Sequence, residues 1–310
     1  MKISKILVLI LVLSMVLAGC VAKEQPEVKT PDSSSEGSAF EGKYLVDAEY
    51  VKSVSGNDNV LLIDARGEDA AKEGTVEGAI AVKWQMIADV EGKPGDPMWG
   101  TILEPAALSE ALSNLGINKD KEIIVFGAVQ NGWGDEGRIA WELIAAGFEN
   151  VKMVDGGLAS LTNAGLSIVK GAAAPVPTEV VVSEIDNSHN INTDALVADY
   201  DSYKVIDVRA DEEYEGQVLY GEAKGGHLPG AIHIKFTDLF KEDGTLKSND
   251  DVTKIFTDAG ISKNDKIVTY CTAGIRSAYM QLVLEMNGYE SSYNYDESFY
   301  RWSAVNELEK

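Results

Sequence analysis

Short apolar runs alternate with helical stretches along most of the chain. After their first residue, runs such as 122–126 and 266–270 consist mainly of β-branched and aromatic residues, as expected of strands that are buried on both faces. Stretches such as 105–115, 138–146 and 277–286 are typical of helices. This alternation predicts an α/β fold in which a largely parallel sheet is covered by helices.

The pattern occurs twice, which predicts two domains of one design. The matching segments are 61–66 with 205–209, 78–82 with 230–234, 122–126 with 266–270, 147–150 with 288–291, and 153–157 with 294–298. A segment rich in Ala and Pro separates the copies. We therefore expect a first domain at 43–170, a linker at 171–178 and a second domain at 179–310.

The N-terminus has the pattern of an export signal. Two lysines precede the apolar run 6–17, which is too short for a confident membrane span. Leu17-Ala18-Gly19-Cys20 resembles the cleavage box of bacterial lipoproteins. The resemblance implies that 1–19 is a signal peptide, that Cys20 is lipidated, and that the protein is exported and anchored on the extracytoplasmic face of a bacterial-type membrane. A transmembrane anchor or an ordinary secretory signal is the alternative.

Composition restricts the partners. Residues 21–42 are rich in Ser, Glu, Pro and Lys, so that 20–42 is expected to be a disordered tether. The formal charge of −23 argues against binding to nucleic acid and against electrostatic docking on anionic lipid. An anionic substrate must then be attracted by local positive charge. We expect the protein to be monomeric.

Cys271 is the strongest candidate for chemistry. The chain has two cysteines, and lipidation of Cys20 would leave Cys271 unpaired. Cys271 lies between a predicted strand and a predicted helix, where backbone N–H groups and the helix N-terminus favour a nucleophilic thiolate. The alternative is an inert buried cysteine. The three histidines show no metal-ligand spacing, and no metal is expected.

The residues around Cys271 resemble the active-site loop of the rhodanese family of sulfurtransferases. The loop is Cys271-Thr272-Ala273-Gly274-Ile275-Arg276-Ser277. Three further segments resemble family motifs in the family's order, namely Val205–Arg209, Gly226–Ile232 and Tyr295–Trp302. In the last of these, Glu297 and Phe299 stand where the family usually has glycine and tryptophan. The resemblance implies two tandem rhodanese-like domains.

The resemblance also implies a role for each residue of the second copy. Cys271 would carry sulfur as a persulfide between a small anionic donor, favoured as thiosulfate, and a thiophilic acceptor such as cyanide or a thiol. Arg276 would bind the sulfonate, and backbone N–H groups of Thr272, Ala273, Gly274, Ile275 and Ser277 would bind the persulfide. No cofactor is implied.

Three nearby side chains are expected to support this loop. Asp207 is expected to accept backbone or arginine hydrogen bonds, and His227 to bond nearby backbone. Arg209 either points into the site to assist anion binding or pairs with Glu213. Trp302 and Trp133 are expected to be core or interface aromatics.

The first copy lacks this chemistry. Gly127 stands opposite Cys271, and the loop that follows is longer, rich in glycine and acidic. Thr75 and Glu77 replace His227 and Pro229. We expect a catalytically silent domain that forms one wall of the site.

Three activities compete with transfer of sulfur from thiosulfate. Cysteine phosphatases resemble this layout but have five residues between cysteine and arginine, whereas this chain has four, which argues against phosphatase or arsenate reductase activity. A mercaptopyruvate-type sulfurtransferase would use the same cysteine with a different donor. A persulfide relay or anion-binding module would use the same loop without turnover.

Overall fold

The computed structural model describes residues 38–310, which form one compact unit. The predicted signal peptide 1–19, Cys20 and all but the end of the predicted tether lie outside the described residues. Among residues 38–310, no helix is both long and apolar enough to cross a membrane.

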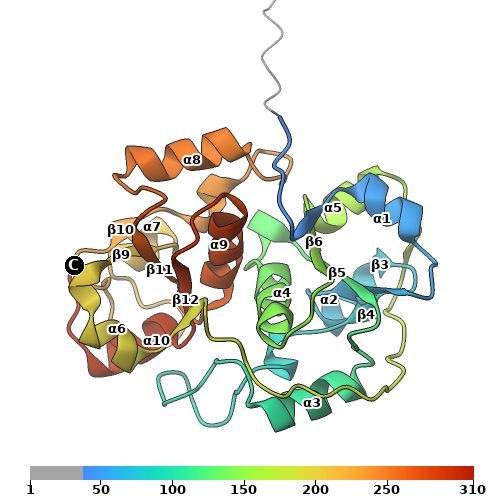
Figure 1. The fold of residues 1–310 in the computed structure, drawn as a ribbon, viewed down its shortest axis with the longest axis horizontal. Coiled ribbons are helices and arrows are strands. Elements are labelled where there is room, and N and C mark those ends of the chain that lie inside the picture. The colour runs from blue at the N-terminus through green and yellow to red at the C-terminus, as the bar shows by residue number, and fades with distance from the viewer. Residues whose placement is uncertain (1–37) are drawn as a thin grey trace, which may run out of the picture. The chain divides into compact units, whose positions relative to one another are not determined.

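The first domain is built on a five-stranded parallel sheet with the strand order β1-β6-β5-β2-β4 (Figure 1). Its strands are β1 (Leu45–Val46), β2 (Val60–Asp64), β4 (Ile80–Ala81), β5 (Glu122–Phe126) and β6 (Val151–Val154). A small antiparallel pair adds β3 (Thr75–Val76) and β7 (Ile168–Val169). Its helices are α1 (Ala48–Val54), α2 (Glu68–Glu73), α3 (Pro105–Asn114), α4 (Asp135–Ala145) and α5 (Gly157–Asn163), with 3-10 turns η1 (Trp84–Met86) and η2 (Val129–Asn131).

The second domain repeats this plan with a parallel sheet in the order β10-β9-β11-β12-β8. Its strands are β8 (Asn190–Ile191), β9 (Tyr203–Asp207), β10 (Ile232–His233), β11 (Lys266–Tyr270) and β12 (Ser292–Tyr295). Its helices are α6 (Thr193–Ala198), α7 (Asp211–Tyr214), α8 (Asn249–Asp258), α9 (Ile275–Met286) and α10 (Ser298–Val305), with η3 (Tyr200–Ser202) and η4 (Phe236–Leu239).

The two sheets confirm the predicted α/β fold. The apolar runs predicted as strands form β5 and β11, at the centre of their sheets, where both faces are covered by helices. Their side chains are almost entirely buried after the first residue. The carboxyl ends of these strands open toward the loops that begin α4 and α9, which is where ligands bind in open parallel sheets.

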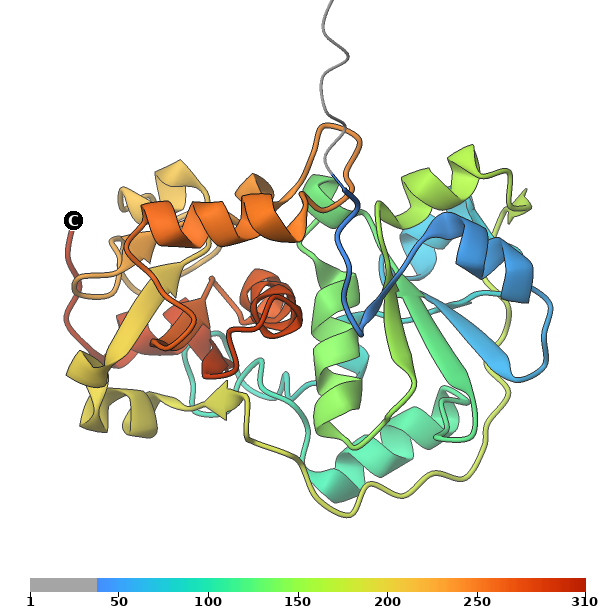
Figure 2. The same ribbon diagram turned by 45° about the horizontal axis from the view of Figure 1, so that its top comes forward.

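The connection between the sheets runs from β7 to β8 and extends beyond the predicted linker 171–178. It lies along α3 (Figure 2). The amides of Thr178 and Val182 donate to the Ser113 carbonyl and the Ser109 hydroxyl, both at 2.9 Å. Val180 and Val182 are buried. The connection is therefore a packed part of the first domain's surface.

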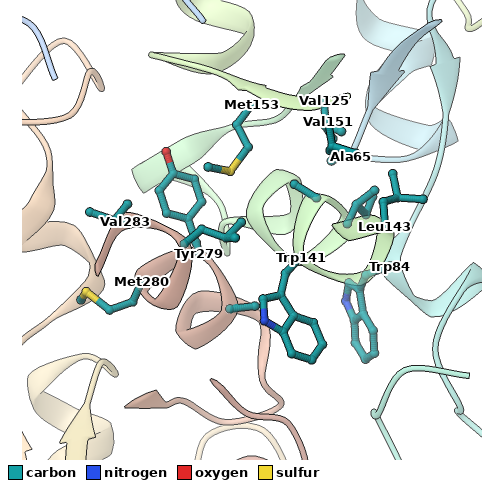
Figure 3. Close-up of a cluster of buried hydrophobic side chains, with 14 of the residues drawn as sticks. Ala65, Trp84, Val125, Trp141, Leu143, Val151, Met153, Tyr279, Met280 and Val283 are labelled. Atoms are coloured by element: carbon teal, nitrogen blue, oxygen red, sulfur yellow. The ribbon is translucent and has the colours of Figure 1, made fainter. Parts of the chain in front are cut away.

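The domains meet where α4 and α9 lie side by side (Figures 1 and 2). One apolar cluster runs through both domains at this contact, and Figure 3 shows side chains from both domains in it, among them Met153 of the first domain beside Tyr279 of α9. Because both domains share this cluster, separating them would expose apolar surface to water. The free-energy cost of that exposure is about 25 cal/mol per Å². The interface therefore holds the two loops in a fixed relation.

A buried arginine adds ion pairs and hydrogen bonds to this interface. Arg138 of α4 is fully buried and pairs with Glu142, 2.8 Å away on its own helix, and with Asp296 of the second domain. It also donates to the carbonyl groups of Gly100, at 2.8 Å, and of Gly274, at 3.4 Å. A cation from the first domain thus touches the loop that carries Cys271.

Candidate active site

Cys271 directly follows β11 and is 2 % exposed. The loop turns into α9 at Gly274, whose φ of 80° is in the left-handed region. A Cβ on Gly274 would lie 2.6 Å from the Asp296 carbonyl oxygen, so that glycine is required by conformation and by space. The Cys271 amide donates to the Ser298 hydroxyl at 2.9 Å, which ties the loop to α10.

The loop favours the thiolate of Cys271. Burial opposes ionisation, but the charge of Arg276 and hydrogen bonds from Ser277 and the Ala273 amide outweigh it, so that the pKa of the thiol is lowered. The Ser277 hydroxyl lies 3.7 Å from the sulfur and 2.7 Å from the Asn294 side-chain oxygen. These contacts place a cation and hydrogen-bond donors around the sulfur.

Arg276 is held by a carboxylate that the sequence does not identify as its partner. Its two terminal nitrogens each donate to Glu213 at 2.7 Å, and one also donates to the Thr272 hydroxyl at 3.0 Å. Thr272 donates to Glu213 at 2.6 Å. Both ends of the guanidinium are therefore occupied, and Arg276 acts on Cys271 mainly through its charge.

Arg209 takes neither of the orientations offered by the sequence. It is fully buried and bonds to Asp207 through Nε and one terminal nitrogen, the latter at 2.7 Å, and it donates to the Gly226 carbonyl at 2.7 Å. Its guanidinium carbon lies 3.8 Å from the centre of the Phe299 ring. Arg209 is not among the residues that line the cleft around Cys271, and Glu213 pairs with Arg276 instead.

The supporting residues lie as predicted. Asp207 accepts from the Arg209 amide and from the Tyr270 hydroxyl at the end of β11. His227 contacts the Tyr214 carbonyl through Nδ1 at 3.0 Å and stacks on the Tyr214 ring. Trp302 is buried in the core of the second domain. Asp207 and His227 therefore hold the backbone around the loop.

Cys271 opens into a cleft of about 460 Å³ between the domains. The second domain contributes Tyr220, Cys271, Thr272, Ala273, Ile275, Arg276 and Tyr300 to its lining. The first domain contributes Ala65, Arg66, Lys83, Trp84, Gln85, Trp99, Trp133 and Asp135. The first domain thus forms one wall of the site. Trp133, predicted to be a core or interface aromatic, lies in the cleft and is 42 % exposed.

A larger cavity of about 620 Å³ lies between α3, the connection and α6. It is lined by Met98, Pro105, Asn187, Asn192, Asp296 and other residues, but by no thiol. Within residues 38–310, no group of three or more His, Cys, Asp or Glu side chains could hold a metal. The chemistry is therefore assigned to the smaller cleft.

The matching loop of the first domain is closed by its own carboxyl group. Gly134 and Gly274 are the left-handed residues that begin α4 and α9, so that Glu136 stands where the second domain has Arg276. A Cβ built on Gly127 would collide with Oε2 of Glu136. The Glu136 carboxyl group, 1 % exposed, fills the space that a cysteine side chain would occupy.

Comparison with known families agrees with this geometry. The rhodanese-like domain family matches the chain twice, at residues 47–164 and 185–305. The chain belongs to the rhodanese family. The two matches coincide with the two sheet domains, so that both the active loop and its closed counterpart are rhodanese-like.

Relatives of this rhodanese-like protein extend over most of its length. A protein of Mycobacterium leprae (strain TN) named "Putative thiosulfate sulfurtransferase" is 26% identical over 270 residues, which is 84% of this chain and 95% of the relative. A protein of Mycobacterium bovis (strain ATCC BAA-935 / AF2122/97) with a similar name is 27% identical over the same coverage. These relatives support a rhodanese-like sulfurtransferase.

Solved structures show the same fold. The anaerobic ergothioneine biosynthesis enzyme from Chlorobium limicola, in complex with trimethyl histidine, matches with a TM-score of 0.74 at 22% identity, covering 86% of this chain and 70% of that one. The wild-type structure of EanB matches with a TM-score of 0.75 at the same identity. At this identity the likeness extends to the fold alone.

Proposed function

We propose that this rhodanese-like protein is a thiosulfate sulfurtransferase that uses Cys271 as the sulfur carrier. The Cys271 thiolate attacks the outer sulfur of thiosulfate and forms a new S–S bond. The bond between that sulfur and the sulfonate breaks, and sulfite leaves with the electron pair. An acceptor nucleophile, cyanide or a thiolate, then attacks the outer sulfur of the persulfide and releases the Cys271 thiolate.

The observation that carries this proposal is a thiol with a lowered pKa at the end of a parallel strand, facing a cleft. The charge of Arg276 and the loop N–H groups favour the thiolate, and the same groups favour an anionic persulfide. The loop has four residues between Cys271 and Arg276, which favours a small cargo over a phosphate. This arrangement supports transfer of a single sulfur.

The donor's sulfonate needs a cation other than Arg276, because the Arg276 guanidinium is already paired with Glu213. Lys83 of the first domain lines the cleft, is half exposed, and lies 3.8 Å from its nearest carboxylate, Asp69. Because this salt bridge is long and exposed, the ammonium group can turn from Asp69 toward an anion in the cleft. We assign the sulfonate to Lys83, with Arg276 supplying the charge nearest the sulfur.

Turnover tests this proposal directly. Purified protein given thiosulfate and cyanide is expected to form sulfite and thiocyanate in equal amounts, and Cys271→Ser is expected to form neither. Mercaptopyruvate serves as the comparison donor. A higher kcat/KM for mercaptopyruvate would replace the proposed donor, and turnover that survives Cys271→Ser would overturn the proposal.

We further propose that the protein acts as an exported monomer attached to a membrane through lipid on Cys20. The proposal rests on the lipoprotein-like segment 17–20, which lies outside the described residues. Labelling cells with radioactive palmitate is expected to mark the protein but not Cys20→Ala. An unlabelled protein would contradict the anchor, and the mass of the soluble form in light scattering tests the monomer.

A further inference from the structure

The cleft at Cys271 is larger and more aromatic than an inorganic donor requires. Its volume of about 460 Å³ is in the range of sites that enclose organic ligands of drug size, roughly 300–1,000 Å³. Five of its lining side chains are aromatic, namely Trp84, Trp99, Trp133, Tyr220 and Tyr300. Thiosulfate and cyanide, each of a few atoms, would leave most of these rings without contact.

The rings hold one another in place. Trp99 lies edge-to-face against Trp84, with ring centres 6.3 Å apart, and against Tyr300 at 5.3 Å. Trp133 lies edge-to-face against Tyr220 at 5.1 Å. The Tyr300 hydroxyl donates to the Tyr220 carbonyl at 2.8 Å, which connects the two groups. Such pairs fix the ring planes, so that the cleft has a preformed aromatic wall.

Two arginines of the cleft are paired with carboxylates, whereas one carboxylate of the cleft has no such close partner. The guanidinium groups of Arg66 and Arg276 each make two hydrogen bonds to one carboxylate, Asp64 and Glu213 respectively. Asp135, at the start of α4, has no salt-bridge partner within 4.0 Å among residues 38–310, and the charge of Lys83 acts on it from farther away. Burial raises the pKa of Asp135 to about 6, so that its carboxyl group is ionised at neutral pH.

A partly buried carboxylate beside preformed aromatic faces is the arrangement that binds an organic cation. The carboxylate supplies charge, and the ring faces that Arg276 and Arg138 do not cover attract a cation. Lys83, a half-exposed cation of the cleft, acts on Asp135 through its charge, and pairing of Lys83 with the donor's sulfonate would leave the Asp135 carboxylate to a cationic ligand. The donor would therefore bind to Lys83 and the acceptor to Asp135, both of which belong to the first domain.

We propose that the cleft is a subsite for a cationic organic thiol, which accepts sulfur from Cys271 while its ammonium group lies between Asp135 and the aromatic wall. The acceptor thiolate attacks the outer persulfide sulfur, a new S–S bond forms, and the Cys271 thiolate leaves. No oxidant or reductant is consumed. The inference rests on the proposed function for its transfer step, but not for its binding step.

Binding is tested first and without sulfur chemistry. Choline and its neutral isostere 3,3-dimethylbutanol are titrated against the full chain, with tryptophan fluorescence as the readout. Saturable binding of choline is expected, weakened about fivefold or more in Asp135→Asn and in Trp99→Leu. Equal responses to choline and to the isostere would overturn the inference whether or not Cys271 accepts sulfur.

Transfer is tested on protein preloaded with sulfur from thiosulfate and freed of excess donor. Discharge is timed by acid quenching and intact mass with thiocholine, cysteamine, 2-mercaptoethanol and 3-mercaptopropionate. For each thiol, the rate in a variant is divided by the wild-type rate, which cancels the intrinsic reactivity of the thiol. In Asp135→Asn this ratio is expected to be about fivefold lower for the two cationic thiols than for the neutral one.

The control is Asp58→Asn, which removes an exposed carboxylate of the same domain away from the cleft. It is expected to retain choline binding and the wild-type rate with every thiol. A uniform fall for all four thiols in Asp135→Asn, or a preference for 3-mercaptopropionate in the wild type, would overturn the inference. If Cys271 does not load, the proposed function fails and the choline titration still decides the binding step.

Discussion

The loops that follow β5 and β11 enter their helices in the same way but carry opposite chemistry. Each turns into its helix through a left-handed glycine, Gly134 or Gly274. Two residues later one domain has Glu136 and the other has Arg276. In the second domain a cation lowers the pKa of a thiol, whereas in the first a carboxyl group occupies the thiol's place. The same scaffold therefore presents a thiol or a buried carboxyl group at the matching position, depending on two side chains in each loop.

A second comparison separates structure from chemistry. In the second domain Arg209 bonds to Asp207 and to the Gly226 carbonyl at 2.7 Å. In the first domain Arg66 bonds in the same way to Asp64, and to the Gly74 carbonyl, both at 2.6 Å. Because the first domain has these bonds without a cysteine in its loop, we infer that the Asp-x-Arg motif serves the fold.

The largest expected effect tests whether the silent domain supports the active loop. Arg138→Met leaves the buried carboxylates of Asp296 and Glu142 without their cation. The free energy of unfolding should fall by about 3–5 kcal/mol, measured by urea denaturation. Lys72→Met, which removes an exposed cation of the same domain, is the control. If the free energy of unfolding falls no more than in the control, the Arg138 ion pairs do not stabilise the contact between the domains.

The next effect tests the role of charge beside the thiol. Arg276→Gln removes the cation that lowers the Cys271 pKa, so that the pKa rises toward its usual range. Persulfide formation needs the thiolate and is lost as the pH falls through this pKa. The acid limb of the loading profile should therefore move to higher pH, and loading at pH 7 should slow about 10- to 100-fold.

The control for Arg276→Gln is Lys254→Gln, which removes an exposed cation of the second domain. It should leave the pH profile unchanged. If Arg276→Gln lowers the rate equally at every pH, the guanidinium acts by position and not through the thiol pKa.

Glu136→Gln tests whether the buried carboxyl group in the loop of the first domain is neutral. Burial raises the Glu136 pKa from 4.5 to about 8. The protonated side chain stabilises the fold fully below pH 4.5, and this stability is lost as the pH rises to about 8. Glu136→Gln should therefore gain stability over the wild type as the pH rises through that window, in urea unfolding at several pH values. A constant difference between the two proteins would contradict a neutral buried carboxyl group.

The smallest expected effect concerns the donor. Lys83→Met should raise the KM for thiosulfate about three- to tenfold and change kcat little, because one partly exposed cation is lost. Steady-state kinetics over a range of salt concentrations measures this, with Lys72→Met as the control. An unchanged KM would remove Lys83 from the donor site.

Local sequence was sufficient to predict the frame of the site. The run at 266–270 forms β11, and the matching run at 122–126 forms β5, which places Gly127 opposite Cys271. The glycine before each helix also provides a reference position from which Glu136 could have been recognised. Counting two residues on from Gly134, as from Gly274 to Arg276, would have found the reversed charge.

Contacts between distant residues could not be predicted in this way. Arg276 and Glu213 are 63 positions apart, and Arg138 and Asp296 are 158 apart, on different domains. No periodicity relates such pairs, since tertiary packing alone brings them together. The aromatic wall was missed for the same reason, because Trp99 lies in an irregular segment before α3.

The central claim is that one domain carries the sulfur and the other does not. After treatment with thiosulfate and removal of the excess, intact mass spectrometry with peptide mapping should find one added sulfur atom, on the peptide that contains Cys271. Cys271→Ser should gain none, and peptides of residues 47–164 should remain unmodified. An added sulfur that persists in Cys271→Ser, or a wild-type protein without any, would contradict the account.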